Sequence, residues 1–228
     1  MGIEPLLLAL IVAAMFVVQA VRALAERFQD RIEFAQATLL GVRALAARHR
    51  MLPDRAGGGW VDGREGLDVH VWFDAYPARH IRRVLHQETG VRARRFRRHL
   101  HWMAPSILVV VRMPRSLGLD LRMSALDHVV PRRRRVPLQS PVLDQLLRVQ
   151  ADDPDRARRL LTPPEVHEPL MDLLGNHPLS VVTEDAIALW CARAVDDPEP
   201  LVDLAVEVAI ALRDRADALS APPSAATR

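Results

Sequence analysis

The sequence has no lysine and a single cysteine, Cys191, among its 228 residues. One cysteine cannot build a disulfide framework, so the chain is not a disulfide-stabilised scaffold. Its position also excludes an N-terminal lipoprotein anchor, and we expect a buried, inert thiol. All 31 basic residues are arginine, which we attribute to GC-rich coding. This raises the pI to 10.2, although the formal net charge is only +3.

Several short motifs of enzymes and metal sites are also missing. The glycines at 57–59 are not followed by Gly-Lys-Ser/Thr, so we interpret them as a loop and not as a phosphate-binding loop. No HExxH, CxxC or EF-hand spacing and no Gly-x-Ser-x-Gly motif occurs. His99 and His101 could bind a metal with His70 or His86, but the arginines around them repel cations. We therefore predict no catalytic residue, no cofactor and no metal.

Charge is missing from one long stretch, Leu6–Val21, in which Gln19 is the strongly polar residue. A helix over residues 5–24 would measure about 30 Å, which matches the hydrocarbon core of a bilayer. We predict a transmembrane anchor over residues 1–24 that contacts the lipid bilayer through residues 5–24.

Two alternatives to the anchor stay open. Ala23-Leu24-Ala25 resembles a signal-peptide cleavage site, although no positive charge precedes the apolar run as a signal peptide requires. A buried core helix is the second alternative, because the run is short enough for one.

The charges that flank the run predict its orientation. Arg22, Arg27 and Arg31 follow it, and no basic residue precedes it. Because positive charge stays on the cytoplasmic side, we expect a single-pass membrane protein with its N-terminus outside and its C-terminal domain in the cytoplasm.

Helical periodicity continues beyond the anchor. Apolar residues recur at intervals of three or four, which predicts a stalk or docking helix over residues 25–52. We expect its stripe to pack on the domain that follows, with a dimeric coiled coil as the alternative. The stripe consists of Leu24, Phe28, Ile32, Ala35, Leu39, Val42 and Ala46.

Residues 59–219 have the pattern of a soluble α+β domain. Alternating or continuously apolar runs predict strands at 67–73, 106–113, 117–123, 142–149, 179–182 and 187–192. We expect 117–123 to pair with 106–113 as a hairpin. Residues 79–101, rich in arginine and histidine, fit either a strand or a short helix.

The second half of this domain contains three predicted helix starts. Asp153-Pro154 predicts a capped helix, Thr162 and Glu165 have capping-box spacing for a second, and Asp197-Pro198 begins a long helix to about 219. The tail, residues 220–228, has the composition of a disordered segment. The predicted fold class is α+β: an N-terminal transmembrane helix running into a stalk helix, then an antiparallel sheet packed with short helices and a long C-terminal helix.

The stretch 142–174 resembles a motif of an uncharacterised bacterial membrane-anchored family, a domain of unknown function. Its parts are Leu147-Arg148-Val149 at the end of a strand, an Asp152-Asp153-Pro154 turn, and Ala-Arg-Arg-Leu-Leu-Thr-Pro at 157–163. The resemblance covers about a fifth of the chain. It implies an α+β domain on a membrane and no particular activity.

Charge is distributed unevenly along the chain. Residues 79–135 contain 15 arginines and 3 acids, whereas residues 136–228 contain 8 arginines and 16 acids. A basic face of this kind is either balanced by the acidic C-terminal third or available to an anionic partner. Anionic lipid headgroups and an acidic protein surface are the candidate partners, and nucleic acid is unlikely for want of a binding module. The candidate contacts are Arg94, Arg95, Arg97, Arg98, Arg132, Arg133, Arg134 and Arg135.

Together these patterns predict a membrane-anchored cytoplasmic α+β domain that acts as a non-enzymatic interaction module with a basic face. A membrane-tethered enzyme with a dispersed active site is the alternative. The sequence leaves the oligomeric state open.

Overall fold

The structure is a computed structural model that describes residues 4–54, 59–75, 79–91, 105–126, 129–130 and 134–220, without the side chains of 4–12, 27–28 and 79. Its helices are α1 Glu4–Arg48, α2 Arg79–Thr89, α3 Pro141–Leu146, α4 Pro154–Leu161, α5 Pro164–Asn176 and α6 Glu199–Ser220. Its strands are β1 Leu52–Pro53, β2 Gly59–Arg64, β3 Leu67–Asp74, β4 Ser106–Arg112, β5 Arg122–Ser124, β6 Arg148–Gln150, β7 Val181–Thr183 and β8 Ala186–Cys191.

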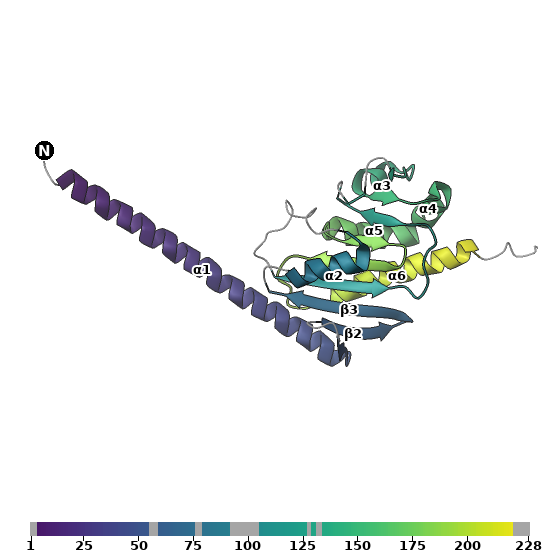
Figure 1. The fold of residues 1–228 in the computed structure, drawn as a ribbon, viewed down its shortest axis with the longest axis horizontal. Helices are drawn as coiled ribbons and strands as arrows, with labels where there is room; N and C mark the ends of the chain where they lie inside the picture. The colour runs from purple at the N-terminus through teal and green to yellow at the C-terminus, as the bar shows by residue number, and fades with distance from the viewer. Residues whose placement is uncertain are drawn as a thin grey trace, which may run out of the picture.

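The strands form one sheet in the order β1-β2-β3-β4-β8-β7-β5-β6, and every neighbouring pair is antiparallel. The predicted α+β class is therefore confirmed: a long N-terminal helix precedes an antiparallel sheet with short helices and a long C-terminal helix (Figure 1).

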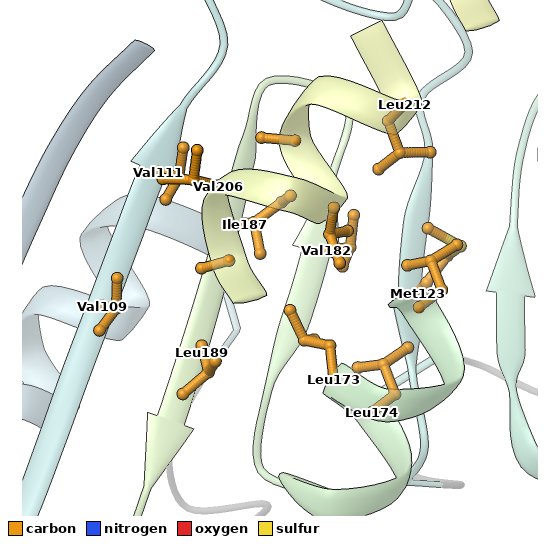
Figure 2. Packing of buried hydrophobic residues seen from close by; sticks show 14 of the residues in the cluster. Val109, Val111, Met123, Leu173, Leu174, Val182, Ile187, Leu189, Val206 and Leu212 are labelled. Atoms are coloured by element: carbon orange, nitrogen blue, oxygen red, sulfur yellow. The ribbon is translucent and has the colours of Figure 1, made fainter. Parts of the chain in front are cut away.

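Strand β4 is at the centre of the packing. Every residue from Ser106 to Val111 is buried, which explains why this run is continuously apolar and does not alternate. Val109 lies between Val71 of β3 and Leu189 of β8 on one face of the sheet. Figure 2 shows Val109 and Leu189 in one cluster with Leu173 and Leu174 of α5 and Val206 and Leu212 of α6.

The opposite face of the sheet has a smaller core, covered by α2. Ile81 and Leu85 of α2 pack there with Trp72, Leu108 and Trp190 of the strands. The prediction left residues 79–101 undecided; residues 79–89 are helical, and residues 92–104 lie outside the described part of the chain.

Two predicted strands are corrected. The hairpin of 117–123 with 106–113 is wrong: only Arg122–Ser124 is a strand, and it pairs with β6 and β7. Residues 142–149 were predicted as one strand, but Pro141–Leu146 is helical and the strand begins at Arg148. Proline at the first helical position favours this short helix, which buries Leu143, and the extended residue Leu147 ends it.

The helix caps were predicted more successfully. The Asp153 carboxylate accepts a hydrogen bond from the Arg156 N–H at 2.9 Å, and that of Asp197 accepts one from the Glu199 N–H at 3.1 Å. The capping box at Thr162 is wrong, because Thr162 ends α4 and its hydroxyl donates to the Arg158 carbonyl.

Helix α1 is a single element of 45 residues, and only its C-terminal part lies against the rest of the fold (Figure 1). Of the predicted apolar stripe, Val42 and Ala46 are buried in the larger core together with Leu45, whereas Leu24 and Ile32 are exposed. The fully buried Thr38 hydroxyl accepts a hydrogen bond from the Val195 N–H at 3.1 Å.

Gly41 allows α1 to approach the loop before α6. A Cβ at this position would lie 2.1 Å from the Asp196 carbonyl oxygen, a distance at which backbone must move. The helix therefore has a glycine in its interior, at a propensity cost of about 1 kcal/mol relative to alanine, because the loop passes too close for any side chain.

We predict that Gly41→Ala destabilises the fold by about 1–3 kcal/mol, since overpacking outweighs the gain in helix propensity. Urea unfolding measures the change. Gly175→Ala is the matched control, because a Cβ on this α5 glycine meets nothing within 4 Å. A stabilised Gly41→Ala variant would contradict the close contact.

Candidate functional site

The N-terminal half of α1 exposes apolar side chains on all sides. Every residue from Ala13 to Glu26 is exposed, and Met15, Phe16, Val17 and Val18 have between 59% and 68% of their surface accessible. Since four consecutive helical residues point in four directions, residues 15–18 present no polar face. Further along the helix, the exposed Arg22 and Glu26 pair with each other at 3.2 Å.

Among the residues whose side chains the structure describes, which in α1 begin at Ala13, no helix is long and apolar enough to cross a membrane. The first part of the predicted anchor, up to residue 12, lies outside those side chains.

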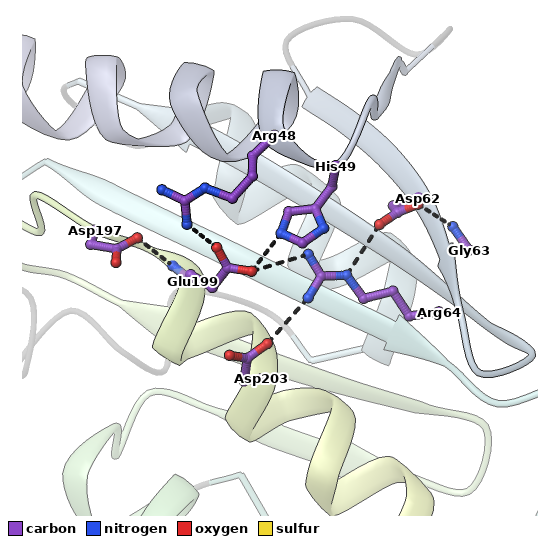
Figure 3. A network of polar contacts seen from close by, with 8 residues as sticks. All are labelled: Arg48, His49, Asp62, Gly63, Arg64, Asp197, Glu199 and Asp203. Carbon is purple, nitrogen blue, oxygen red and sulfur yellow. Dashed lines mark hydrogen bonds and ion pairs between the residues drawn. The ribbon is translucent and has the colours of Figure 1, made fainter.

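At its other end α1 is fixed by a network around one carboxylate, that of Glu199 at the start of α6 (Figure 3). Arg48 pairs with one carboxylate oxygen, and His49 Nε2 lies 2.5 Å from the other. A third basic residue, Arg64 of β2, lies 3.9 Å from Glu199. The network therefore joins the end of α1, an edge of the sheet and the C-terminal helix.

Further acids complete the network. Arg64 Nε lies 3.1 Å from Asp62 Oδ2, and Arg64 Nη1 lies 3.2 Å from Asp203 Oδ1. The side chains of Arg64 and Glu199 are only 14% and 19% exposed, so their charges are partly shielded from solvent. Three basic groups are thus matched by three carboxylates over three elements.

The environment of Glu199 acts on its pKa in two directions. Partial burial opposes ionisation, but the hydrogen bonds from His49 and Arg48 outweigh it, and the pKa of Glu199 is lowered. A carboxylate that stays ionised beside two permanently charged guanidinium groups is poorly suited to proton transfer near neutral pH. The arrangement is suited to holding α1 in place.

The predicted basic contacts are only partly within the described structure. Arg94, Arg95, Arg97, Arg98, Arg132 and Arg133 lie outside the described residues. Arg134 is exposed, and Arg135 is half-buried where it bridges to Gln150 beside β6. Arg134 and Arg135 are therefore the two predicted contacts that the structure places, at the β6 edge of the sheet.

Part of the surplus positive charge is matched within the basic segment itself. Arg112 of β4 makes a two-pronged ion pair with Glu88 of α2, with bonds of 2.6–2.9 Å. Both residues belong to the segment 79–135, so this pair is not a match with the acidic C-terminal third.

Among the described residues, no group of three or more histidine, cysteine or acidic side chains could hold a metal ion. His99 and His101 lie outside the described part of the chain. Burial and then the nearby Arg112 lower the pKa of His70, whose ring stacks on Trp72 at 5.3 Å. Cys191 is buried as predicted, and burial raises the pKa of its thiol.

Sequence analysis missed the network around Glu199. Arg48 and His49 are about 150 residues from Glu199, and each of these residues looks like an ordinary exposed residue of a helix end. The Asp197-Pro198 helix start was the one available signal, since an acid in the first turn of a helix attracts cations.

Comparison with known proteins adds little. No family model matches the chain, and no curated protein matches it. A distant structural similarity is to the crystal structure of the mycobacterial trehalose monomycolate transport factor A, TtfA, with a TM-score of 0.37 and 8% identity over 69% of this chain and 70% of that one. At this level the similarity says nothing about activity.

We predict that Glu199→Gln destabilises the fold by about 1–3 kcal/mol at neutral pH, because hydrogen bonds to a charged group are lost. Since the folded pKa of Glu199 is depressed, its stabilisation is present above the unfolded pKa and disappears as pH falls through the folded pKa. The difference between wild type and variant should therefore shrink on acidification. Urea unfolding at a series of pH values measures it.

Glu207→Gln is the control, because Glu207 is exposed on the same helix. It should cost little at any pH. A Glu199→Gln variant as stable as wild type at neutral pH would show that the network does not hold α1.

Proposed function

We propose that the protein is a non-enzymatic interaction module held on a membrane by α1. The observation that carries the proposal is the contrast between the two ends of this helix. One end is apolar on all sides and exposed, and the other is fixed to the domain by Glu199. Large exposed apolar surfaces mark contact with a membrane or with another protein.

A bilayer suits the exposed end of α1 better than a protein groove does. A groove covers one face of a helix, whereas Met15, Phe16, Val17 and Val18 together surround the helix axis. Hydrocarbon surrounds a helix completely and leaves no backbone group unpaired. The cytoplasmic orientation predicted from Arg22, Arg27 and Arg31 is part of this proposal.

The proposal places the domain close to the bilayer surface. Among the α1 side chains that the structure describes, the first that is partly covered is Arg31, and the proposed anchor ends at Leu24. Seven residues of helix span about 10 Å, close to the Debye length of about 8 Å at physiological salt. Basic residues on the near side of the domain would then lie within reach of anionic headgroups.

Deleting residues 1–21 should move the protein from the membrane pellet to the supernatant after ultracentrifugation. Urea unfolding should show an unchanged stability of the domain, because the deleted residues that the structure describes make no contact with the domain core. A folded deletion variant that still sediments with membranes would contradict the anchor. A mature wild-type chain that begins near Glu26 would show a cleaved signal peptide instead.

The basic block makes a second prediction. With residues 1–21 removed, the domain should bind vesicles that contain anionic lipid, not neutral vesicles, and salt should abolish the binding. Replacing Arg132, Arg133, Arg134 and Arg135 by glutamine should remove most of it. Vesicle co-sedimentation measures the bound fraction.

The control removes the same charge elsewhere, with glutamine at the exposed Arg43, Arg50, Arg115 and Arg159. An equal loss in both variants would mean that net charge alone governs binding. Binding to neutral vesicles, or none to anionic ones, would contradict the lipid contact and favour the acidic protein partner.

A further inference from the structure

A small cavity lies where β8 ends and the turn after α5 returns toward the sheet. It has a volume of about 180 Å³ and is lined by residues of 176–179 and 190–193. Its floor is buried: Leu179, Trp190 and Cys191 have at most 5% of their surface exposed. Arg193 stands at its rim and is exposed.

The cavity contains one buried polar side chain that the fold does not use. His177 is 6% exposed, and no described residue hydrogen-bonds to its imidazole. Burial and then the charge of Arg193 lower its pKa, so the ring is neutral and offers one N–H donor and one acceptor nitrogen. The ring nitrogens of His177 are not among the described buried atoms that lack a partner, so solvent or a ligand in the cavity can reach them.

The charge at the cavity is positive. Arg193 lies near both His177 and Cys191, and no described carboxylate pairs with its guanidinium. The nearest acids along the chain, Asp196 and Asp197, lie beyond the turn, where Asp197 caps α6. A guanidinium beside a neutral imidazole provides directed donors for a carboxylate or a phosphate.

The path of the chain after β8 shows which end of the domain the cavity occupies. Val195 meets Thr38 of α1, Asp196 meets Gly41, and Glu199 meets His49, so this segment runs away from the N-terminus of α1. Residues that precede Val195, including Arg193, therefore lie at the end nearer the exposed apolar half of α1. In the proposed membrane arrangement, that end faces the bilayer.

We propose that this cavity binds the anionic headgroup of a small amphiphile, with its carboxylate or phosphate on Arg193 and His177 and a short apolar stem against Leu179 and Trp190. Typical ligand pockets measure roughly 300–1,000 Å³, so a cavity of about 180 Å³ suits a headgroup with a few methylenes and not a whole lipid. The location toward the membrane rests on the proposed function; the chemistry of the cavity does not.

The test measures the binding of sodium hexanoate to the full-length protein in a neutral detergent by isothermal titration calorimetry. At ten times its Kd, hexanoate should also raise the thermal midpoint, because it binds the folded protein and not the unfolded chain.

Both effects should vanish in Arg193→Gln and persist in part in Arg193→Lys, which keeps the charge. Arg115→Gln, an exposed arginine after β4, is the control and should behave like wild type. Hexanol lacks the charge and should neither bind nor raise the thermal midpoint. Acetate and inorganic phosphate lack the stem and should act only weakly.

The absence of both binding heat and a shift of the midpoint with hexanoate would overturn the proposal. Equal effects of hexanol would overturn the role of Arg193, and equal effects of acetate or phosphate would indicate a site for free anions. The experiment contains no bilayer, so its failure is distinguishable from a failure of the membrane anchor, which the deletion of residues 1–21 tests.

Discussion

The arrangement of α1 on the domain depends on one carboxylate. Glu199 is the point at which α1, β2 and α6 meet, and each of these elements comes from a different part of the sequence. Apolar contacts through Val42 and Leu45 bury the helix but would tolerate small rotations about its axis. The directed bonds from Arg48 and His49 select one rotation, so the polar contacts supply geometry while the apolar contacts supply most of the free energy.

The sheet explains why the domain can hold such a helix at its edge. Strand β4 is buried on both faces, with α5 and α6 on one side and α2 on the other. This leaves β1 and β2 at the sheet edge beside the end of α1, where Arg64 is available to the network. The polar joint therefore forms at the border of the core, where charges keep some access to water and the penalty for burying them is reduced.

Local sequence patterns predicted those strands and helix caps that depend on residues close together in the sequence. The runs at 67–73 and 106–113 became strands because their alternation or continuous apolarity matches one-sided or two-sided burial. Asp153 and Asp197 were recognised as caps because capping acts within three residues. The helix Pro141–Leu146 was missed, because an apolar run this short fits the two-residue period of a strand as well as the 3.6-residue period of a helix.

Long-range pairing was beyond such patterns. The segment 117–123 was assigned to a hairpin because of proximity in sequence, yet Leu117 donates its N–H to the Glu184 carbonyl at 2.8 Å, far along the chain. The network of Glu199 and the cavity at His177 and Arg193 depend likewise on tertiary contacts. Single residues of common types carry no periodic signal, so only the folded chain brings them together.

Because α1 is one unbroken helix, a change of its angle at one end moves the other end, as in a lever. From Leu24 to Arg48 the helix is continuous and about 37 Å long, and it contains no proline. Its far end cannot rotate independently of α6, because the loop at Asp196 leaves no space at Gly41. If the helix tilted by about 10° at residue 24, its other end, at the Glu199 network, would therefore move by about 6 Å, estimated from that helix length. The whole domain would move with it. The position of the domain thus reports the angle of the helix.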